Sequence, residues 1–148
     1  MGGSSALTFA AIHPQLVDGV AAMNGTANHL EYEKFQDAIA ASFGGTKSEI
    51  PAEYKKRSAE YWPERLTMPV GFTASGKDAS VPPQSVLRLA GILEKLHHPV
   101  LLIYRKDMGH TSKPEDAQRV IEYVTAQALR PEDADSESSP RTTIEVAP

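Results

Sequence analysis

Residues 68–83 read MPVGFTASGKDASVPP, an apolar run that is closed by a glycine and an aspartate before two prolines open a helical pattern. A second run of this kind, residues 99–112, reads PVLLIYRKDMGHTS and ends at a Gly-His pair. Short apolar runs that alternate with helical patterns are typical of a parallel α/β sheet. Functional groups of such sheets gather beyond the carboxyl ends of the strands. We therefore expect Asp78 and His110 at that end.

The first residues, 1–14, read MGGSSALTFAAIHP. Residues 4–12 are compatible with a helix, and His13-Pro14 ends it, because a residue before proline is pushed out of the α region. The two glycines at the start would let this helix pass close to a strand. Residues 17–23 are strand-like and supply a third run.

Helical patterns fill the segments between and after these runs. Asn28 to Glu31 fits a capping box ahead of a helix that Gly44-Gly45 ends, and residues 54–61 form a shorter helix or turn. Ser112 to Glu115 caps the last helix. The helix over residues 83–97 places on one face Val86, Leu89, Ala90, Leu93 and Leu96. In the last helix, the residues expected to point inward are Ala117, Val120, Ile121, Val124 and Ala128. The pattern predicts about three parallel strands flanked by helices.

With these segments in place, residues 1–129 resemble the C-terminal half of an α/β-hydrolase, close to its esterase and prolyl-oligopeptidase-like branch. Members of this superfamily carry a serine in a Gly-x-Ser-x-Gly elbow, then an aspartate after a late strand, then a histidine after the final strand. The segments Gly-Lys-Asp-x-x-Val-Pro and Met-Gly-His fit the last two features. Met1-Gly2-Gly3 reads like an elbow cut off just after its serine.

The resemblance implies a role for three residues. Asp78 would be the triad acid and His110 the general base, which takes the serine proton and returns it to the leaving group. The backbone N–H of Met1 would be one donor of the oxyanion hole. The sequence departs from the family pattern because it holds neither the serine nor the strand before it, so we expect this chain to be inactive alone.

Each assignment has an alternative. Asp78 could be a turn residue, because aspartate bonds to nearby backbone groups, and His110 could be an ordinary loop histidine. Ser4 is a rival nucleophile, since residues 2–6 loosely fit Gly-x-Ser-x-Ala. A strand should precede such an elbow, however, and only three residues do.

Composition narrows the function classes. The formal charge is −4, and residues 131–148 hold five acids against Arg141, which leaves 14 residues of each sign in the body. A neutral body without a stripe of basic residues does not show the clustered positive charge that binds the phosphates of a nucleic acid. There is no cysteine and no histidine cluster with metal-ligand spacing, so the sequence implies no metal or other cofactor. No apolar stretch is long enough to span a bilayer.

The sequence therefore predicts two parts, a hydrolase-like portion over residues 1–130 and a disordered acidic tail over residues 131–148. Two functions remain open. In the first, the chain belongs to a serine hydrolase that cleaves a small-molecule ester or a peptide bond through an acyl-serine intermediate. In the second, it is a non-catalytic domain that associates, with itself or a partner, through the unpaired edge of the strand at residues 17–23.

Overall fold

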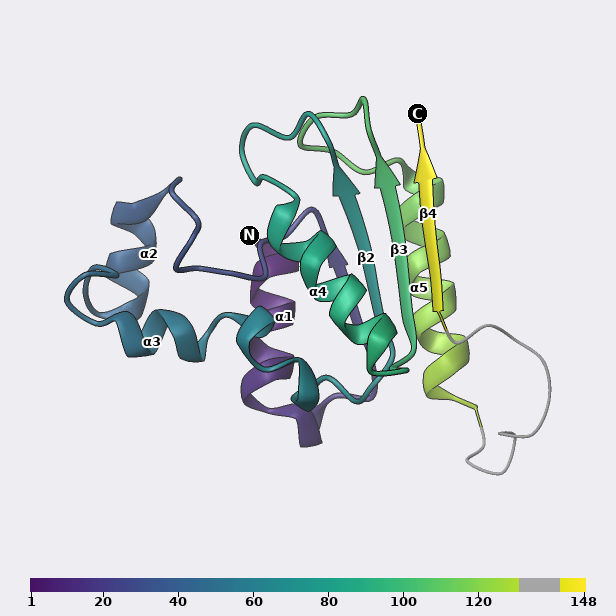
Figure 1. Cartoon of the computed structure of the whole chain (residues 1–148), viewed down its shortest axis with the longest axis horizontal. Coiled ribbons are helices and arrows are strands. Elements are labelled where there is room, and N and C mark those ends of the chain that lie inside the picture. The colour runs from purple at the N-terminus through teal and green to yellow at the C-terminus, as the bar shows by residue number, and fades with distance from the viewer. Residues whose placement is uncertain (131–141) are drawn as a thin grey trace.

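The computed structural model describes residues 1–130 and 142–148, and its centre is a parallel sheet of four strands in the order β1-β2-β3-β4 (Figure 1). The strands are β1 (Val20–Met23), β2 (Val70–Ser75), β3 (Val100–Arg105) and β4 (Thr142–Ala147). The three strands predicted from the sequence are confirmed, and their carboxyl ends lie at one end of the sheet. The fourth strand is a difference from the prediction.

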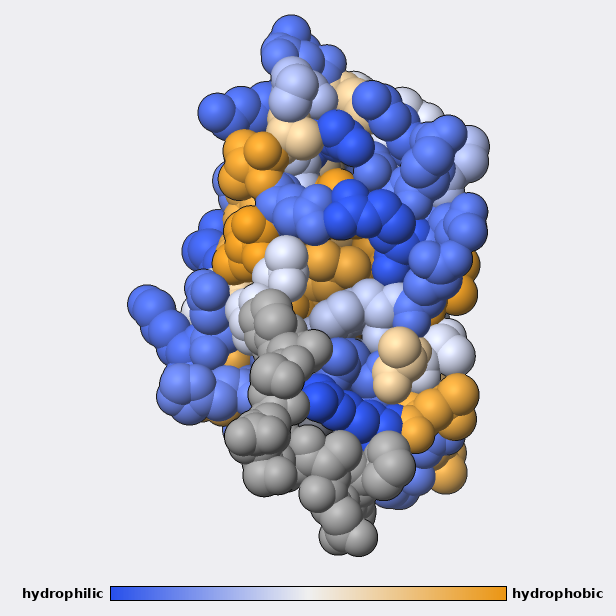
Figure 2. Space-filling view, turned by 90° about the vertical axis from the view of Figure 1, so that its right-hand side faces the viewer, coloured by the Kyte–Doolittle hydropathy of each residue, from blue (hydrophilic) through white to orange (hydrophobic). Residues whose placement is uncertain are grey.

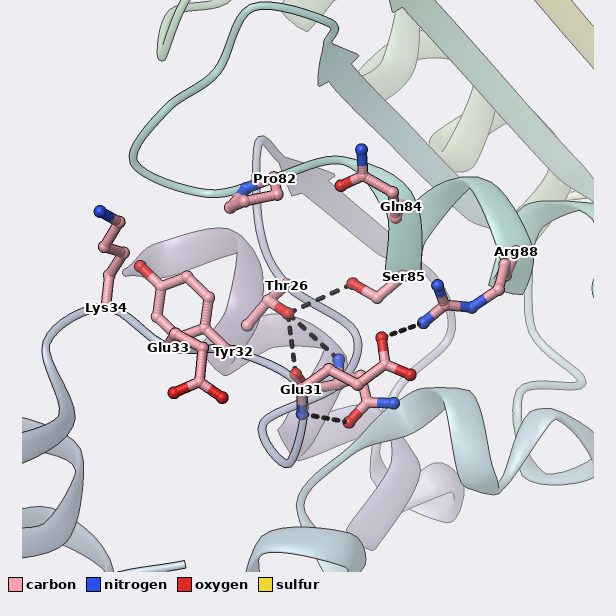
Figure 3. A pocket seen from close by; sticks show the side chains of 10 residues that line it. Thr26, Glu31, Tyr32, Glu33, Lys34, Pro82, Gln84, Ser85 and Arg88 are labelled. Atoms are coloured by element: carbon pink, nitrogen blue, oxygen red, sulfur yellow. Dashed lines mark hydrogen bonds and ion pairs between the residues drawn. The ribbon is translucent and has the colours of Figure 1, made fainter.

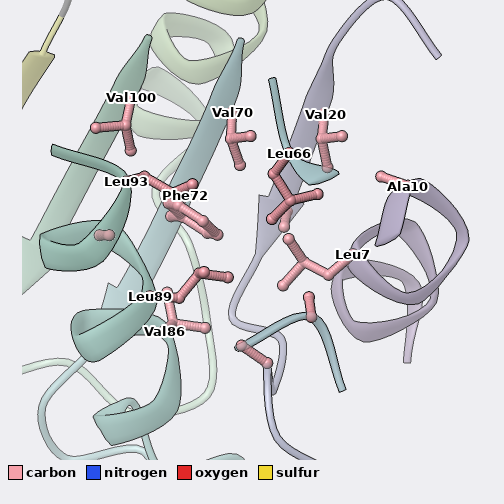
Figure 4. Packing of buried hydrophobic residues seen from close by; sticks show 14 of the residues in the cluster. Leu7, Ala10, Val20, Leu66, Val70, Phe72, Val86, Leu89, Leu93 and Val100 are labelled. Atoms are coloured by element: carbon pink, nitrogen blue, oxygen red, sulfur yellow. The ribbon is translucent and has the colours of Figure 1, made fainter. Parts of the chain in front are cut away.

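Three long helices cover the two faces of the sheet: α1 (Gly2–Ile12), α4 (Gln84–Lys95) and α5 (Pro114–Ala128). Helices α1 and α4 share one core cluster, in which Leu7 and Leu89 pack with Phe72 of β2 (Figure 4). Helix α5 covers the other face, where Val120 packs with Leu101 and Ile103 of β3. All six residues of β2 are buried, as is usual for a central parallel strand with helices on both faces.

Short elements make up the excursion between β1 and β2. They are α2 (Gln36–Phe43), α3 (Pro51–Lys56), and the 3₁₀ turns η2 (Ala59–Tyr61) and η3 (Pro63–Arg65); another such turn, η1 (Pro14–Leu16), precedes β1. Figure 1 shows α2 and α3 standing away from the sheet, and the return segment with η2 and η3 comes back against α1 and α4. No helix in the part of the chain that the structure describes is long and apolar enough to cross a membrane.

Strand β4 corrects the prediction that the tail is disordered over residues 142–148. It pairs in parallel with β3, from Val100 opposite Thr142 to Arg105 opposite Ala147. The segment is rich in β-branched residues, and its side chains alternate between the two faces. Figure 2 looks onto this side of the molecule, where apolar surface lies between hydrophilic side chains. The rest of the predicted tail, residues 131–141, lies outside the described residues.

Three helix details also differ from the sequence pattern. Helix α2 begins at Gln36, and Asn28 instead accepts the backbone N–H groups of Leu30 and Glu31 in a turn. Ile121 and Leu96, which were predicted to face inward, are 51% and 44% exposed. Both residues lie at the margin of the apolar face of their helix. The periodic pattern identifies that face, but it does not show how much of the face the sheet covers.

Strand β1 lies at one edge of the sheet. It pairs with β2 on one side, and no strand of the described residues pairs with its other side. The backbone of such a strand presents free N–H and C=O groups to a further strand. Self-association through this edge stays a prediction.

His29 is a buried ring near α1 whose bonds fix its tautomer. The Thr8 hydroxyl donates its one hydrogen to the carbonyl of Arg57 at 2.8 Å, so His29 Nε2, at 3.2 Å, must donate to Thr8 Oγ1. His29 Nδ1 is buried without a partner among the described residues. Burial, and then the charge of Arg57, lowers the pKa of His29 from 6.5 to about 4.

This lowered pKa predicts acid sensitivity. Between pH 6.5 and pH 4 the unfolded chain binds a proton on His29 that the folded chain does not, so the free energy of unfolding falls as the pH falls. We expect the folded protein to lose roughly 3 kcal/mol between pH 7 and pH 4 through this residue. Urea denaturation of the wild type and His29→Gln measures it, because the variant should lose that part of the pH dependence. Equal pH dependence in both proteins would contradict the assignment.

Candidate active site

Asp78 follows β2 and uses its two carboxylate oxygens differently. Oδ1 accepts the backbone N–H groups of Ser80 at 2.9 Å and Val81 at 2.8 Å, which closes a tight turn over the prolines that precede α4. The side chain is 1% exposed. The turn interpretation of this residue is therefore correct for Oδ1, and it leaves Oδ2 free to bind a second group.

That second group is His110, which follows β3. Its Nδ1 lies 2.7 Å from Asp78 Oδ2. An ionised carboxylate only accepts hydrogen bonds, so Nδ1 carries the hydrogen, and Nε2 of the neutral ring holds a lone pair. Nε2 makes no hydrogen bond within residues 1–130 and 142–148, and the side chain is 45% exposed. The ring is thus fixed at one nitrogen and accessible at the other, as a general base requires.

The loops that carry these residues are joined by backbone bonds. Lys77 N–H donates to the carbonyl of Met108 at 2.9 Å, and Gly76 N–H donates to that of Arg105 at 2.8 Å. A side chain at Gly76 would not fit, because its Cβ would lie 2.4 Å from the carbonyl oxygen of Lys106. The sequence pattern therefore predicted the Asp78–His110 contact, and a glycine at position 76 permits it.

Met1 and Ser4 lie at the start of α1. Met1 is fully exposed, and its carbonyl accepts the N–H of Ser5 at 3.1 Å. Ser4 Oγ accepts the N–H of Thr26 at 2.9 Å, so this hydroxyl ties the helix to the segment after β1. The described residues show no hydrogen bond from either residue to His110. The structure brings Asp78 and His110 together but does not link Met1 to them.

A pocket of about 310 Å³, which no pattern in the sequence predicted, lies between the segment after β1 and the start of α4 (Figure 3). Tyr32 lines it and donates its hydroxyl hydrogen to the carbonyl of Ser80 at 2.8 Å, in the turn that Asp78 closes. Burial, and then the negative charge of Asp78, raises the pKa of Tyr32. Arg88 lines the same pocket and pairs with Glu31 and Glu60. These residues come from separate segments, so no local motif signals them.

No three histidine, aspartate or glutamate side chains come together as a metal site within the described residues.

The family model described as the prolyl oligopeptidase family matches residues 1–129. A comparison with curated protein sequences gave no match. Among solved structures, a puromycin hydrolase is similar over 99% of this chain and 22% of its own, with a TM-score of 0.70 and 17% identity.

Two further solved structures are similar to this chain. The acylaminoacyl peptidase of Pyrococcus horikoshii matches 88% of this chain and 23% of its own, with a TM-score of 0.64 and 17% identity. Dipeptidyl peptidase 4 of Porphyromonas gingivalis matches 82% of this chain and 18% of its own, with a TM-score of 0.66 and 17% identity. These identities show a shared fold. The chain spans about a fifth of the length of each of the three proteins.

Proposed function

This chain belongs to the prolyl oligopeptidase family, and from that premise we propose that it supplies the acid and the base of a Ser-His-Asp triad to a longer serine peptidase. The fold is that of the α/β-hydrolases, and the family supports a serine peptidase-like parent. The observation that carries the proposal is the 2.7 Å contact between His110 Nδ1 and Asp78 Oδ2. Nε2 makes no hydrogen bond to the described residues, and the half-exposed side chain leaves room for a nucleophile to approach it.

The proposed reaction has two halves. A serine hydroxyl loses its proton to His110 Nε2 while its oxygen attacks the acyl carbon, and His110 then returns that proton to the leaving amine or alcohol. This leaves an acyl-serine. Water then attacks the acyl carbon, gives a proton to Nε2, and the acid product leaves as the serine takes the proton back. Asp78 holds the ring in the required tautomer and stabilises the imidazolium.

The serine would belong to a segment that precedes Met1 in the longer protein. The free edge of β1 supports this assignment, because a strand paired there would end beside the start of α1. The backbone N–H of Met1 would then be one oxyanion donor. The substrate class we propose is a peptide bond or an ester, in line with the peptidases that share the fold.

A second function rests on the same free edge. A strand edge with unpaired backbone groups also binds partners or a second copy, and such a domain would need no nucleophile. The two functions differ in what an added upstream strand should do: it completes an active site in the first and only covers a docking edge in the second.

An organophosphonate probe for active serines tests the proposal on two proteins, the 148-residue chain and a chain extended upstream through a strand and a Gly-x-Ser sequence. We expect no labelling of the first protein and stoichiometric labelling of the second, because the probe needs a serine activated by His110. Serine→Ala at the added position is the control and should abolish labelling. Sedimentation of both proteins should show self-association in the shorter one only.

Two results would contradict the proposal. Labelling of the 148-residue chain that Ser4→Ala removes would show that the elbow lies within this chain. A folded, extended chain that takes up no probe, while it loses self-association, would favour the docking function.

A further inference from the structure

Two polar side chains of β2 bind the loop that carries His110, and a third, at the end of β1, contacts both of them. We propose that Asn24, Thr73 and Ser75 are positioning residues for His110, which hold the loop backbone while Asp78 holds the ring. The inference rests on the proposed function of His110, and it names groups that touch neither substrate nor reacting atoms.

Two of these residues lie on β2 and contact the two residues that follow His110. Ser75 is 3% exposed, and its hydroxyl donates to the carbonyl of Thr111 at 3.1 Å. Thr73 is 4% exposed, and its Oγ1 lies 2.6 Å from Ser112 Oγ. Both contacts run from a buried central strand to a loop that is mostly exposed.

Asn24 joins the two hydroxyls from the end of β1. Its backbone N–H donates to the Thr73 carbonyl at 3.0 Å, and its Oδ1 lies 3.3 Å from Thr73 Oγ1 and 3.4 Å from Ser75 Oγ. A hydroxyl has one hydrogen, so Ser75 gives its hydrogen to the nearer acceptor, Thr111. Between Thr73 and Ser112 either hydroxyl can be the donor. The contacts connect the loop to β1 through the two hydroxyls of β2.

The backbone at Asn24 fits this role. Its φ is 43°, in the left-handed region, which asparagine tolerates better than most residues other than glycine. The conformation follows directly after β1 and turns the amide toward β2. Ser112 was predicted to cap α5, but that helix begins at Pro114 with no side-chain cap, and Ser112 is bound to Thr73 instead.

Apart from the bond between Lys77 N–H and the Met108 carbonyl, the loop has few other contacts with the sheet among the described residues. His110, Thr111 and Lys113 are exposed, and Thr111 N–H closes a tight turn onto the Gly109 carbonyl at 2.7 Å. One bond at Nδ1 leaves the ring free to pivot about Asp78, whereas a second attachment through the backbone fixes where Nε2 points. Misplacement of a catalytic group by about 1 Å can cost about 100-fold in rate, so this second attachment has a functional effect.

The test uses NMR of the whole 148-residue chain, with the imidazole nitrogens labelled. The readouts are the hydrogen-bonded Nδ1–H proton of His110 and the amide exchange rates of residues 109–113. For Ser75→Ala we expect loss of the protected Nδ1–H signal and amide exchange faster by about tenfold or more, which corresponds to about 1.4 kcal/mol, because the backbone tether is gone.

Ser58→Ala is the matched control. Ser58 is fully buried, and its hydroxyl also donates to a backbone carbonyl, that of Tyr54 at 2.7 Å, but in the return segment rather than the His110 loop. This variant should lose global stability and leave both His110 readouts unchanged. Equal effects of Ser58→Ala and Ser75→Ala on His110 would show a merely structural role and overturn the inference.

Thr73 supplies a second pair of variants in case Ser75→Ala does not fold. Thr73→Val keeps the shape and removes the hydroxyl, whereas Thr73→Ser keeps the hydroxyl. We expect the valine variant to lose the Nδ1–H signal and the serine variant to retain it. Wild-type readouts in Thr73→Val would refute the positioning role. Because nothing in this measurement depends on hydrolysis, its outcome is independent of whether an extended chain is active.

Discussion

Asp78→Asn is expected to lower kcat about 10⁴-fold in a chain extended upstream to include the serine strand. The asparagine amide has nearly the shape of the carboxylate, so the turn through Ser80 and Val81 can persist. It can present an N–H group to His110 Nδ1, however, which favours the tautomer with the hydrogen on Nε2. That ring cannot accept the serine proton, and no negative charge remains beside the imidazolium.

Steady-state hydrolysis of an activated ester measures this loss, with Asp18→Asn as the matched control. Asp18 is exposed and lies just before β1, at the amino end of the strands and so at the opposite end of the sheet from the site. Its variant should retain the wild-type kcat within about a factor of two, as is usual for surface substitutions. The double variant Asp78→Asn/His110→Ala should be no slower than His110→Ala alone, because the two residues act as a unit. Additive losses, or a mild effect of Asp78→Asn, would refute the triad.

Gly25→Ala is expected to destabilise the fold by about 3 kcal/mol or more, or to prevent folding. A Cβ at this position would lie 2.5 Å from the backbone N of Ser4 and 2.6 Å from the backbone C of Gly3. Gly3 is equally confined, with Met23 O at 2.5 Å from its Cβ position. The atoms nearest to both Cβ positions belong to the backbone, at the place where α1 crosses the end of β1. Rotation of a side chain therefore cannot relieve the contact.

Two other glycines serve as controls in the same measurement, chemical denaturation followed by circular dichroism. A Cβ at Gly2 or at Gly91 would meet nothing within 4 Å. Gly91 lies inside α4, so Gly91→Ala should stabilise the protein by about 0.5–1 kcal/mol through helix propensity. Gly2→Ala, one residue from Gly3 in the same helix, should be close to neutral. A Gly25→Ala variant as stable as Gly2→Ala would show that the helix and the strand do not cross this closely.

Patterns of apolar and turn residues in the sequence were sufficient to predict much of the fold and the two residues at the centre of the candidate site. Three buried strands are visible as short apolar runs between turn residues, and the carboxyl ends of parallel strands necessarily lie together. That rule places Asp78 and His110 at the same end of the sheet, just beyond the neighbouring strands β2 and β3, where the two side chains can meet. Of the two glycines expected to let the first helix pass close to a strand, Gly3 does so at β1, whereas a Cβ at Gly2 would meet nothing within 4 Å. The role of Met1 stays a prediction.

The sequence by itself thus determined what depends on spacing within one segment: which runs form β1, β2 and β3, which face of a helix is apolar, and which end of the sheet a residue follows. Only the tertiary structure decided what depends on partners far along the chain. Strand β4 exists because β3 offers it an edge, Asn28 forms a turn rather than a cap, and Ser112 binds Thr73, which lies 39 residues away. The pocket at Tyr32 likewise forms between separate segments. A polar side chain has several possible partners of similar strength, so its choice is set by which of them the folded backbone brings within reach.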